Sequence, residues 1–139
     1  MVIQNKKRVL VVDDEKDITL VCTMILEDAG FEVDVFTDSI LALSNFKPNF
    51  YDLVILDIKM PHMDGFELYR KIKDLDDKVK VCFLTASEMY YEIFRSKEYS
   101  SIDSDLFIYK PIGNKDLMQK VNKIITSWRL KQEMQILLF

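Results

Sequence analysis

Polar side chains follow four of the apolar runs in this sequence, each at the point where the run stops. Asp13 and Asp14 follow the first run, Asp57 and Thr85 follow two later runs, and Lys110 follows the last. One acid after an apolar run is usually a helix cap or a solvated turn, but these side chains together can do chemistry. A carboxylate can attack phosphorus, a lysine can hold a phosphoryl oxygen, and a hydroxyl can donate to one. We therefore expect a site that accepts a phosphoryl group, with Asp57 as the acceptor.

The three acidic residues of this set predict a bound cation. If Asp13, Asp14 and Asp57 converge, two carboxylates about 4 Å apart repel by roughly 4 kcal/mol at an effective dielectric of about 20. Oxygen ligands without a paired His or Cys favour a hard ion, and a small, open carboxylate site suits Mg²⁺ better than Ca²⁺ or Zn²⁺. His62 is the sole histidine, so it has no partner for a histidine-based metal site. We expect it in a surface loop.

Short apolar runs that alternate with helical segments predict how these residues are positioned. The predicted strands cover residues 8–12, 31–36, 53–56, 79–84 and 106–109. The run at 53–56 is the most apolar and fits a central strand, whereas 31–36 alternates and suits a half-exposed edge strand. Five strands alternating with five helices predict a doubly wound α/β fold, a parallel sheet covered on both faces. Ligands bind such sheets at the carboxyl ends of the strands, where the polar side chains stand.

The helix boundaries are marked by capping residues and glycines. From Ile18 the apolar residues follow the spacing of one helix face, and Gly30 supplies a left-handed stop. Asp38 or Ser39 can cap a short second helix. Further helix starts are expected at residues 64–65 and near 113–114, with a helical stretch between the fourth and fifth strands that carries Tyr90, Tyr91, Phe94 and Tyr99.

The length, composition and charge of the chain limit the classes of protein to which it can belong. A chain of 139 residues, 49% hydrophobic and 30% charged, predicts one domain with its own core. The formal net charge is −4 with the basic residues scattered, which disfavours direct nucleic-acid binding. No apolar run approaches the roughly 18 residues of a membrane span, and the first eight residues lack a secretory signal, so we expect a cytoplasmic protein with no membrane partner. Cys22 and Cys82 lie in apolar segments, and we expect both to be reduced and buried.

Four motifs together resemble the receiver (response-regulator) domain of two-component signalling over residues 7–127. They are Val-Leu-Val-Val-Asp-Asp-Glu at 9–15, Asp-Ile-Lys-Met-Pro-His-Met-Asp-Gly at 57–65, Leu-Thr-Ala at 84–86 and Tyr-Lys-Pro at 109–111. Each short motif is weak alone, but together, in order and at strand ends, they are highly specific. The resemblance implies a (βα)5 sheet in the flavodoxin-like strand order 2-1-3-4-5.

The same resemblance implies a chemical role for each acidic residue. Asp57 would take a phosphoryl group from the phosphohistidine of a histidine kinase and form an acyl phosphate. Asp14 and Asp57 would bind Mg²⁺, or Mn²⁺ in its place, directly, together with the backbone carbonyl of Lys59, and Asp13 would bind it mostly through water. Lys110 would hold the phosphoryl oxygen. The chain would then catalyse its own phosphorylation and dephosphorylation and would not be a turnover enzyme for an external substrate.

A switch and a set of partners are also implied by the resemblance. Thr85 would move to hydrogen-bond the phosphoryl group, and Phe107 would turn inward as it does so. Ala86 is small enough to leave the pocket open, and Pro111 would follow a cis peptide that aims Lys110. The partners would be a sensor histidine kinase or phosphotransfer protein, and an output partner or second copy at the face formed by the fourth helix, the fifth strand and the last helix.

Some positions depart from the usual pattern of that family. The stretch between Thr85 and Lys110 is a few residues longer than usual, and 103–104 is Asp-Ser where Gly-Ala is common. We therefore expect a reshaped fourth helix and exit loop. Gly113 stands where a capping Asp or Ser is commoner, so the last helix is expected to start at Asn114.

The C-terminal segment carries two apolar stripes with different directions. We expect residues 1–127 to form the receiver domain and 128–139 a helical extension. The extension could be a tail folded on its own domain, a dimer contact, or the start of a linker to an output domain. The first stripe, which should pack on the sheet, is Leu117, Val121, Ile124, Ile125 and Trp128, and the second is Leu130, Met134, Leu137 and Leu138.

Three other functions can be weighed against phosphoryl acceptance. A phosphorylation-independent interaction module on the same fold usually loses an acid, the Thr or the Lys, and all of these are present here. A metal-dependent phosphatase that acts through an aspartyl phosphate would show Asp-x-Asp-x-Thr, and the run at 13–17 has no Thr. Flavin binding needs a phosphate-cradling loop after the first strand, where the acidic pair would repel an anion.

Overall fold

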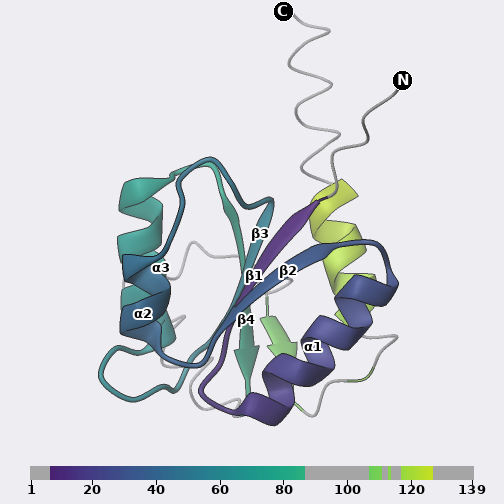
Figure 1. The fold of residues 1–139 in the computed structure, drawn as a ribbon, viewed down its shortest axis with the longest axis horizontal. Helices are drawn as coiled ribbons and strands as arrows, with labels where there is room; N and C mark the ends of the chain where they lie inside the picture. Colours follow the sequence, from purple (N-terminus) through teal and green to yellow (C-terminus); the bar gives the residue numbers. More distant parts are fainter. Residues whose placement is uncertain (1–6, 87–106, 111–112, 114–116, 127–139) are drawn as a thin grey trace, which may run out of the picture.

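In the computed structural model, five parallel strands form one sheet in the order β2-β1-β3-β4-β5 (Figure 1). The strands are β1 (Arg8–Val12), β2 (Glu32–Phe36), β3 (Leu53–Asp57), β4 (Lys80–Thr85) and β5 (Phe107–Tyr109). The structure describes residues 7–86, 107–110, 113 and 117–126. Each strand agrees with its predicted run to within one residue at either end. The doubly wound α/β fold and its strand order are therefore confirmed.

Helices cover both faces of the sheet (Figure 1). Helix α1 (Lys16–Asp28) and the helical residues 117–126 lie on one face, and α2 (Ser39–Ser44) and α3 (Gly65–Leu75) lie on the other. Successive strand residues point to opposite faces, so each strand contributes to two separate cores. Val9 and Val11 pack with Cys22 and Leu26 of α1, whereas Leu10 and Val12 pack on the opposite side.

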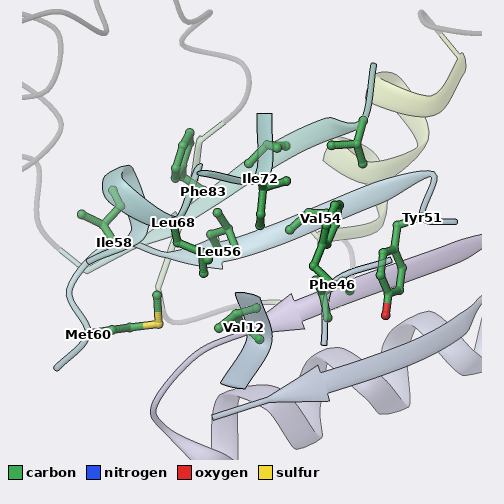
Figure 2. Packing of buried hydrophobic residues seen from close by; sticks show 14 of the residues in the cluster. Val12, Phe46, Tyr51, Val54, Leu56, Ile58, Met60, Leu68, Ile72 and Phe83 are labelled. Atoms are coloured by element: carbon green, nitrogen blue, oxygen red, sulfur yellow. The ribbon is translucent and has the colours of Figure 1, made fainter. Parts of the chain in front are cut away.

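The core beneath α2 and α3 is formed by buried side chains from the strands, from these two helices and from the turn after β3 (Figure 2). Val12 and Leu56 are fully buried there beside Leu68 and Ile72 of α3. Ile58 and Met60, in the turn that follows β3, also belong to this cluster. The segment directly after Asp57 is therefore anchored by buried apolar side chains rather than projecting freely into solvent.

The helix boundaries follow from local hydrogen bonds. Gly30, just beyond α1, has a φ of 95°, which a residue with a side chain rarely adopts. The sequence indicated that either Asp38 or Ser39 could cap α2. In the structure Asp38 is the cap, and its Oδ1 accepts the N–H groups of Ile40 and Leu41 at 2.8 and 3.2 Å. Asp64 caps α3 by accepting the N–H of Glu67 at 2.9 Å.

Both cysteines are free and buried, as predicted. Burial raises the pKa of each thiol to about 12, because a thiolate would lose its hydration. His62 is exposed in the loop after β3, also as predicted. No helix in the described part of the chain has the length and apolar character that crossing a membrane requires.

Several sequence predictions fall beyond the described residues. They include the helical stretch with Tyr90, Tyr91, Phe94 and Tyr99, the start of the last helix at Asn114, and the extension at 128–139. Residues 117–126 are helical, and four members of the first apolar stripe are buried against the sheet: Leu117, Val121, Ile124 and Ile125. Trp128 and the second stripe lie outside the described ranges.

Candidate functional site

Three carboxylates converge at the carboxyl end of the sheet. Asp13, Asp14 and Asp57 each offer an oxygen, and these oxygens all lie within 4.8 Å of one another. The register explains the meeting, since Val12 of β1 pairs with Leu56 of β3, so that Asp13, just after β1, and Asp57, the last residue of β3, come to the same edge of the sheet. The predicted acidic cluster is therefore present.

The first residue of α3, Gly65, lies directly against the backbone of Asp57. The Gly65 N–H donates to the Ile58 carbonyl at 2.7 Å. A Cβ on Gly65 would collide with the Asp57 carbonyl oxygen and would lie 2.9 Å from Ile58 Cα. A glycine is required here because the two backbones approach too closely for any side chain. The sequence indicated this residue as a helix start and did not predict that it fixes the path of the chain after Asp57.

Asp13 is fully buried, and its two carboxylate oxygens have different partners. Its Oδ1 accepts the N–H of Glu15 at 2.9 Å, and its own N–H donates to the Phe36 carbonyl at 3.2 Å. Its Oδ2 accepts no hydrogen bond, although Lys110 Nζ lies 2.9 Å away as an ion pair. Burial raises the pKa of Asp13, and the Glu15 N–H and the Lys110 charge lower it by less.

Asp57 is 4% exposed and is held in an unfavourable environment for a charge. Burial, together with the negative charge of Asp13, raises the pKa of Asp57 to about 7, and a hydrogen bond with Asp14 acts in the same direction. The ammonium of Lys110, 3.3 Å from Asp57 Oδ1, opposes this rise. Asp14 itself is exposed. A group that adds positive charge would therefore stabilise this cluster.

Lys110 brings a positive charge to the cluster from the far side of β4. It follows β5, and its side chain is 10% exposed. Burial lowers the pKa of Lys110, but Asp13, Asp57 and Glu15 outweigh burial and hold it above the ordinary value. Its hydrogen bond goes to Glu15 Oε1, at 3.1 Å. The sequence predicted that Lys110 would hold a phosphoryl oxygen and did not identify Glu15 as its partner.

The donor set of this cluster fits a hard divalent cation. Three carboxylates face one point, one of them carries a buried oxygen without a hydrogen bond, and no histidine or cysteine belongs to the group. Oxygen-rich sites of this kind suit Mg²⁺, which keeps several waters and takes one or two carboxylates. Lys59, whose backbone carbonyl the resemblance assigns to the metal, lies exposed in the turn directly after β3.

Thr85 and Ala86 lie at the same edge of the sheet. Thr85 is the last residue of β4 and pairs with Tyr109 of β5, one residue before Lys110. The Thr85 side chain and Pro111 lie outside the described part of the structure. Ala86 is exposed directly after β4.

Phe107 is a buried residue of the core. It is 1% exposed, and its ring stacks on Phe83 with centroids 5.3 Å apart and an interplanar angle of 24°. Phe66 and Tyr69 of α3 meet the same Phe83 ring at 5.7 and 5.4 Å with near edge-on geometry. Phe107 is therefore coupled by packing to helix α3.

Comparisons with known proteins agree on one family. A family model described as the response regulator receiver domain matches residues 9–122. The response regulator SaeR of Staphylococcus epidermidis is 30% identical over 116 residues, which cover 84% of this chain and 49% of that protein. The transcriptional regulatory protein RprY of Bacteroides fragilis is 27% identical over 127 residues, 91% of this chain and 52% of that protein. The chain thus spans about half the length of these two relatives.

A solved structure has the same architecture. The crystal structure of a receiver domain protein from Methanospirillum hungatei JF-1 superposes with a TM-score of 0.76 at 27% identity. The match covers 91% of this chain and 99% of that one. The fold described above is therefore shared with a solved domain over nearly its full length.

Proposed function

Because this chain belongs to the response regulator receiver domain family of two-component signalling, we propose that Asp57 accepts a phosphoryl group from a phosphohistidine. The observation that carries the proposal is the meeting of Asp57 with Lys110 and two further carboxylates at one edge of the sheet. Burial keeps solvent from most of Asp57, while its side chain remains 6% exposed to an incoming donor.

The transfer is a displacement at phosphorus. An oxygen of ionised Asp57 attacks, the phosphorus–nitrogen bond of the donor breaks, and its electron pair returns to the imidazole, so that an acyl phosphate forms on Asp57. Lys110 donates to a phosphoryl oxygen and balances part of its charge. The fully buried Asp13 holds its place through the Glu15 N–H and keeps one oxygen directed at the cluster.

Asp13, Asp14, Asp57 and the backbone carbonyl of Lys59 would hold Mg²⁺, with Mn²⁺ as a substitute. The support is the donor set itself, three carboxylates within 4.8 Å and a buried oxygen that accepts no hydrogen bond. When bound, the ion supplies charge neutralisation for the attacking and transferred oxygens. Without it, the three carboxylates repel one another and an anionic donor as well.

Thr85 and Phe107 would form the switch of the domain. Thr85 ends the strand next to β3, at the edge where the phosphoryl group would arrive, and Ala86 beside it leaves room for that group. Phe107 is buried against Phe83, which fits an inward position of its ring. Pro111 would hold the Lys110 backbone in the orientation that aims the ammonium at the site.

The partners follow from the phosphoryl chemistry. A sensor histidine kinase or phosphotransfer protein would supply the phosphoryl group, and an output partner or a second copy would bind the face around β5. The receiver domain would span residues 1–127, and residues 128–139 would form a helical extension that is a tail folded on its own domain, a dimer contact or the start of a linker to an output domain. The protein would work in the cytoplasm and would modify only itself.

Intact mass after incubation with acetyl phosphate and Mg²⁺ tests the proposal. We expect the wild-type chain to gain one phosphoryl group, and we expect the gain to disappear in Asp57→Asn and in EDTA. If the wild-type chain gains nothing under conditions that modify a known receiver, the phosphoacceptor function is wrong. A phosphorylation-independent interaction module on the same fold would then be the better account.

A further inference from the structure

The Lys110 ammonium contacts three carboxylates, and the most exposed of them is that of Glu15. Nζ lies 2.9 Å from Asp13 Oδ2 and 3.3 Å from Asp57 Oδ1, and both are ion-pair contacts. The hydrogen bond runs to Glu15 Oε1 at 3.1 Å, although the Glu15 side chain is 62% exposed. The residue proposed to hold the phosphoryl group is therefore already engaged by an acid at the rim of the site.

The backbone of Glu15 is fixed from two sides. Its carbonyl accepts the N–H groups of Ile18 and Thr19, at 3.1 and 3.2 Å, at the start of α1. Its own N–H donates to Asp13 Oδ1. Because these bonds hold the main chain in place, the side chain reaches Lys110 from a defined origin and its length determines whether the contact forms.

We propose that Glu15 holds Lys110 in the resting domain and competes with the phosphoryl group for its ammonium, which slows the phosphorylation of Asp57. This inference rests on the proposed function, since it concerns the same transfer. Glu15 is a positioning residue here, because it acts through Lys110 and does not contact the reacting atoms.

The competition follows from the geometry of a buried lysine. The Lys110 side chain is 10% exposed, so its ammonium has few positions open to it. Three carboxylates face the three N–H donors of this ammonium, so an arriving phosphoryl oxygen must displace one of them, and Glu15 is the only one of the three that is exposed. Loss of the contact would therefore raise the rate by about twofold to fivefold, the range expected for one solvent-accessible ion pair.

Variants at Glu15 distinguish the effect of the length of its side chain from the effect of its charge. Glu15→Asp keeps the charge and removes one methylene, so the carboxylate no longer reaches Lys110. Glu15→Gln keeps the reach and removes the charge, and Glu15→Ala removes both. Asp17→Asn is the matched control, because Asp17 is an exposed acid in the first turn of the same helix.

The measurement is the rate of Asp57 phosphorylation by acetyl phosphate at saturating Mg²⁺, followed by intact mass. We expect Glu15→Asp and Glu15→Ala to react about twofold to fivefold faster than wild type and Asp17→Asn to react at the wild-type rate. A wild-type rate in Glu15→Asp, with faster reaction in Glu15→Gln, would show that charge alone acts and would overturn the inference.

A second readout does not depend on catalysis. Exchange of the Lys110 ammonium protons with water, followed by its ¹H–¹⁵N correlation, should accelerate in Glu15→Asp and remain unchanged in Asp17→Asn. Unchanged exchange in Glu15→Asp would show that Glu15 does not hold Lys110 and would overturn the inference. If wild type is phosphorylated and all variants match it, the inference alone fails. If wild type takes no phosphoryl group, the proposed function fails and the inference fails with it.

Discussion

Gly65 lies so close to Asp57 that the first turn of α3 rests on the backbone of the proposed phosphoryl acceptor. The Gly65 N–H bonds the Ile58 carbonyl at 2.7 Å, and a Cβ at position 65 would meet the Asp57 carbonyl oxygen. The position of the Asp57 carboxylate therefore depends on helix α3 as well as on strand β3. A substitution at Gly65 should disturb stability and chemistry together.

Gly65→Ala is expected to lower the free energy of unfolding by about 1–3 kcal/mol, because the added methyl group must displace backbone. It should also slow the phosphorylation of Asp57. Gly30→Ala is the matched control. Gly30 has a φ of 95° but no atom within 4 Å of an added Cβ, so this variant should lose about 1–2 kcal/mol through backbone strain alone. Urea denaturation and the acetyl phosphate rate check both variants, and equal rates in the two would contradict the argument.

The buried thiols predict a loss of stability in alkali. The pKa of Cys22 and of Cys82 is about 12 in the folded chain, raised from 9.0 mainly by burial. Below about pH 9 the thiols are protonated in both states, so stability is unaffected. Above it, the unfolded chain ionises first and stability falls until the pH reaches the folded pKa. By pH 10 the loss should be about 1.4 kcal/mol per thiol.

Urea denaturation at pH 8 and pH 10 measures this loss. The double variant Cys22→Ala and Cys82→Ala, although less stable overall, should lose less between the two pH values than wild type. Tyr51 adds to the decline at higher pH, because burial and its hydrogen bond to Asp34 raise its pKa. An equal decline in wild type and the double variant would rule out the thiols as its source.

Phe107 should contribute more stability than Phe66, which is only partly buried. Phe107→Ala is expected to cost about 3–5 kcal/mol, because it leaves a cavity against Phe83. Phe66→Ala should cost clearly less, since Phe66 is partly buried. Urea denaturation of the two variants at one pH gives the comparison. If Phe66→Ala proved as costly as Phe107→Ala, the packing argument would be wrong.

The fold could be predicted from the sequence because the sheet is parallel and buried. Apolar runs such as Arg8–Val12 and Leu53–Asp57 leave few alternatives to strands, and parallel strands place their carboxyl ends at one edge. Asp13, Asp14 and Asp57 converge because the strands that position them end at the same edge of the sheet, not because of their spacing in the sequence.

The individual contacts at and near the site could not be predicted, because they depend on distances that the sequence pattern does not contain. Asp38 and Ser39 can both cap a helix, and the structure has Asp38 as the cap while the Ser39 hydroxyl donates to the Pro61 carbonyl at 3.4 Å. The Glu15 partner of Lys110 depends on how far a lysine reaches across the end of β4. The approach of Gly65 to Asp57 depends on the backbone path after β3.

Asp57→Asn should stabilise the metal-free domain, because Asp57 is a buried carboxylate beside two others. At neutral pH in EDTA the variant should have a higher free energy of unfolding than wild type, since Lys110 keeps Asp13 and Glu15 as partners while the repulsion among the carboxylates decreases.

Mg²⁺ at ten times its dissociation constant should stabilise wild type by about 1.4 kcal/mol and Asp57→Asn much less. Thermal unfolding with and without Mg²⁺ measures both effects, and Asp17→Asn should respond to Mg²⁺ as wild type does. A wild-type chain as stable in EDTA as Asp57→Asn would mean that the acidic cluster carries no unfavourable charge, which would remove the physical reason for a cation at this site.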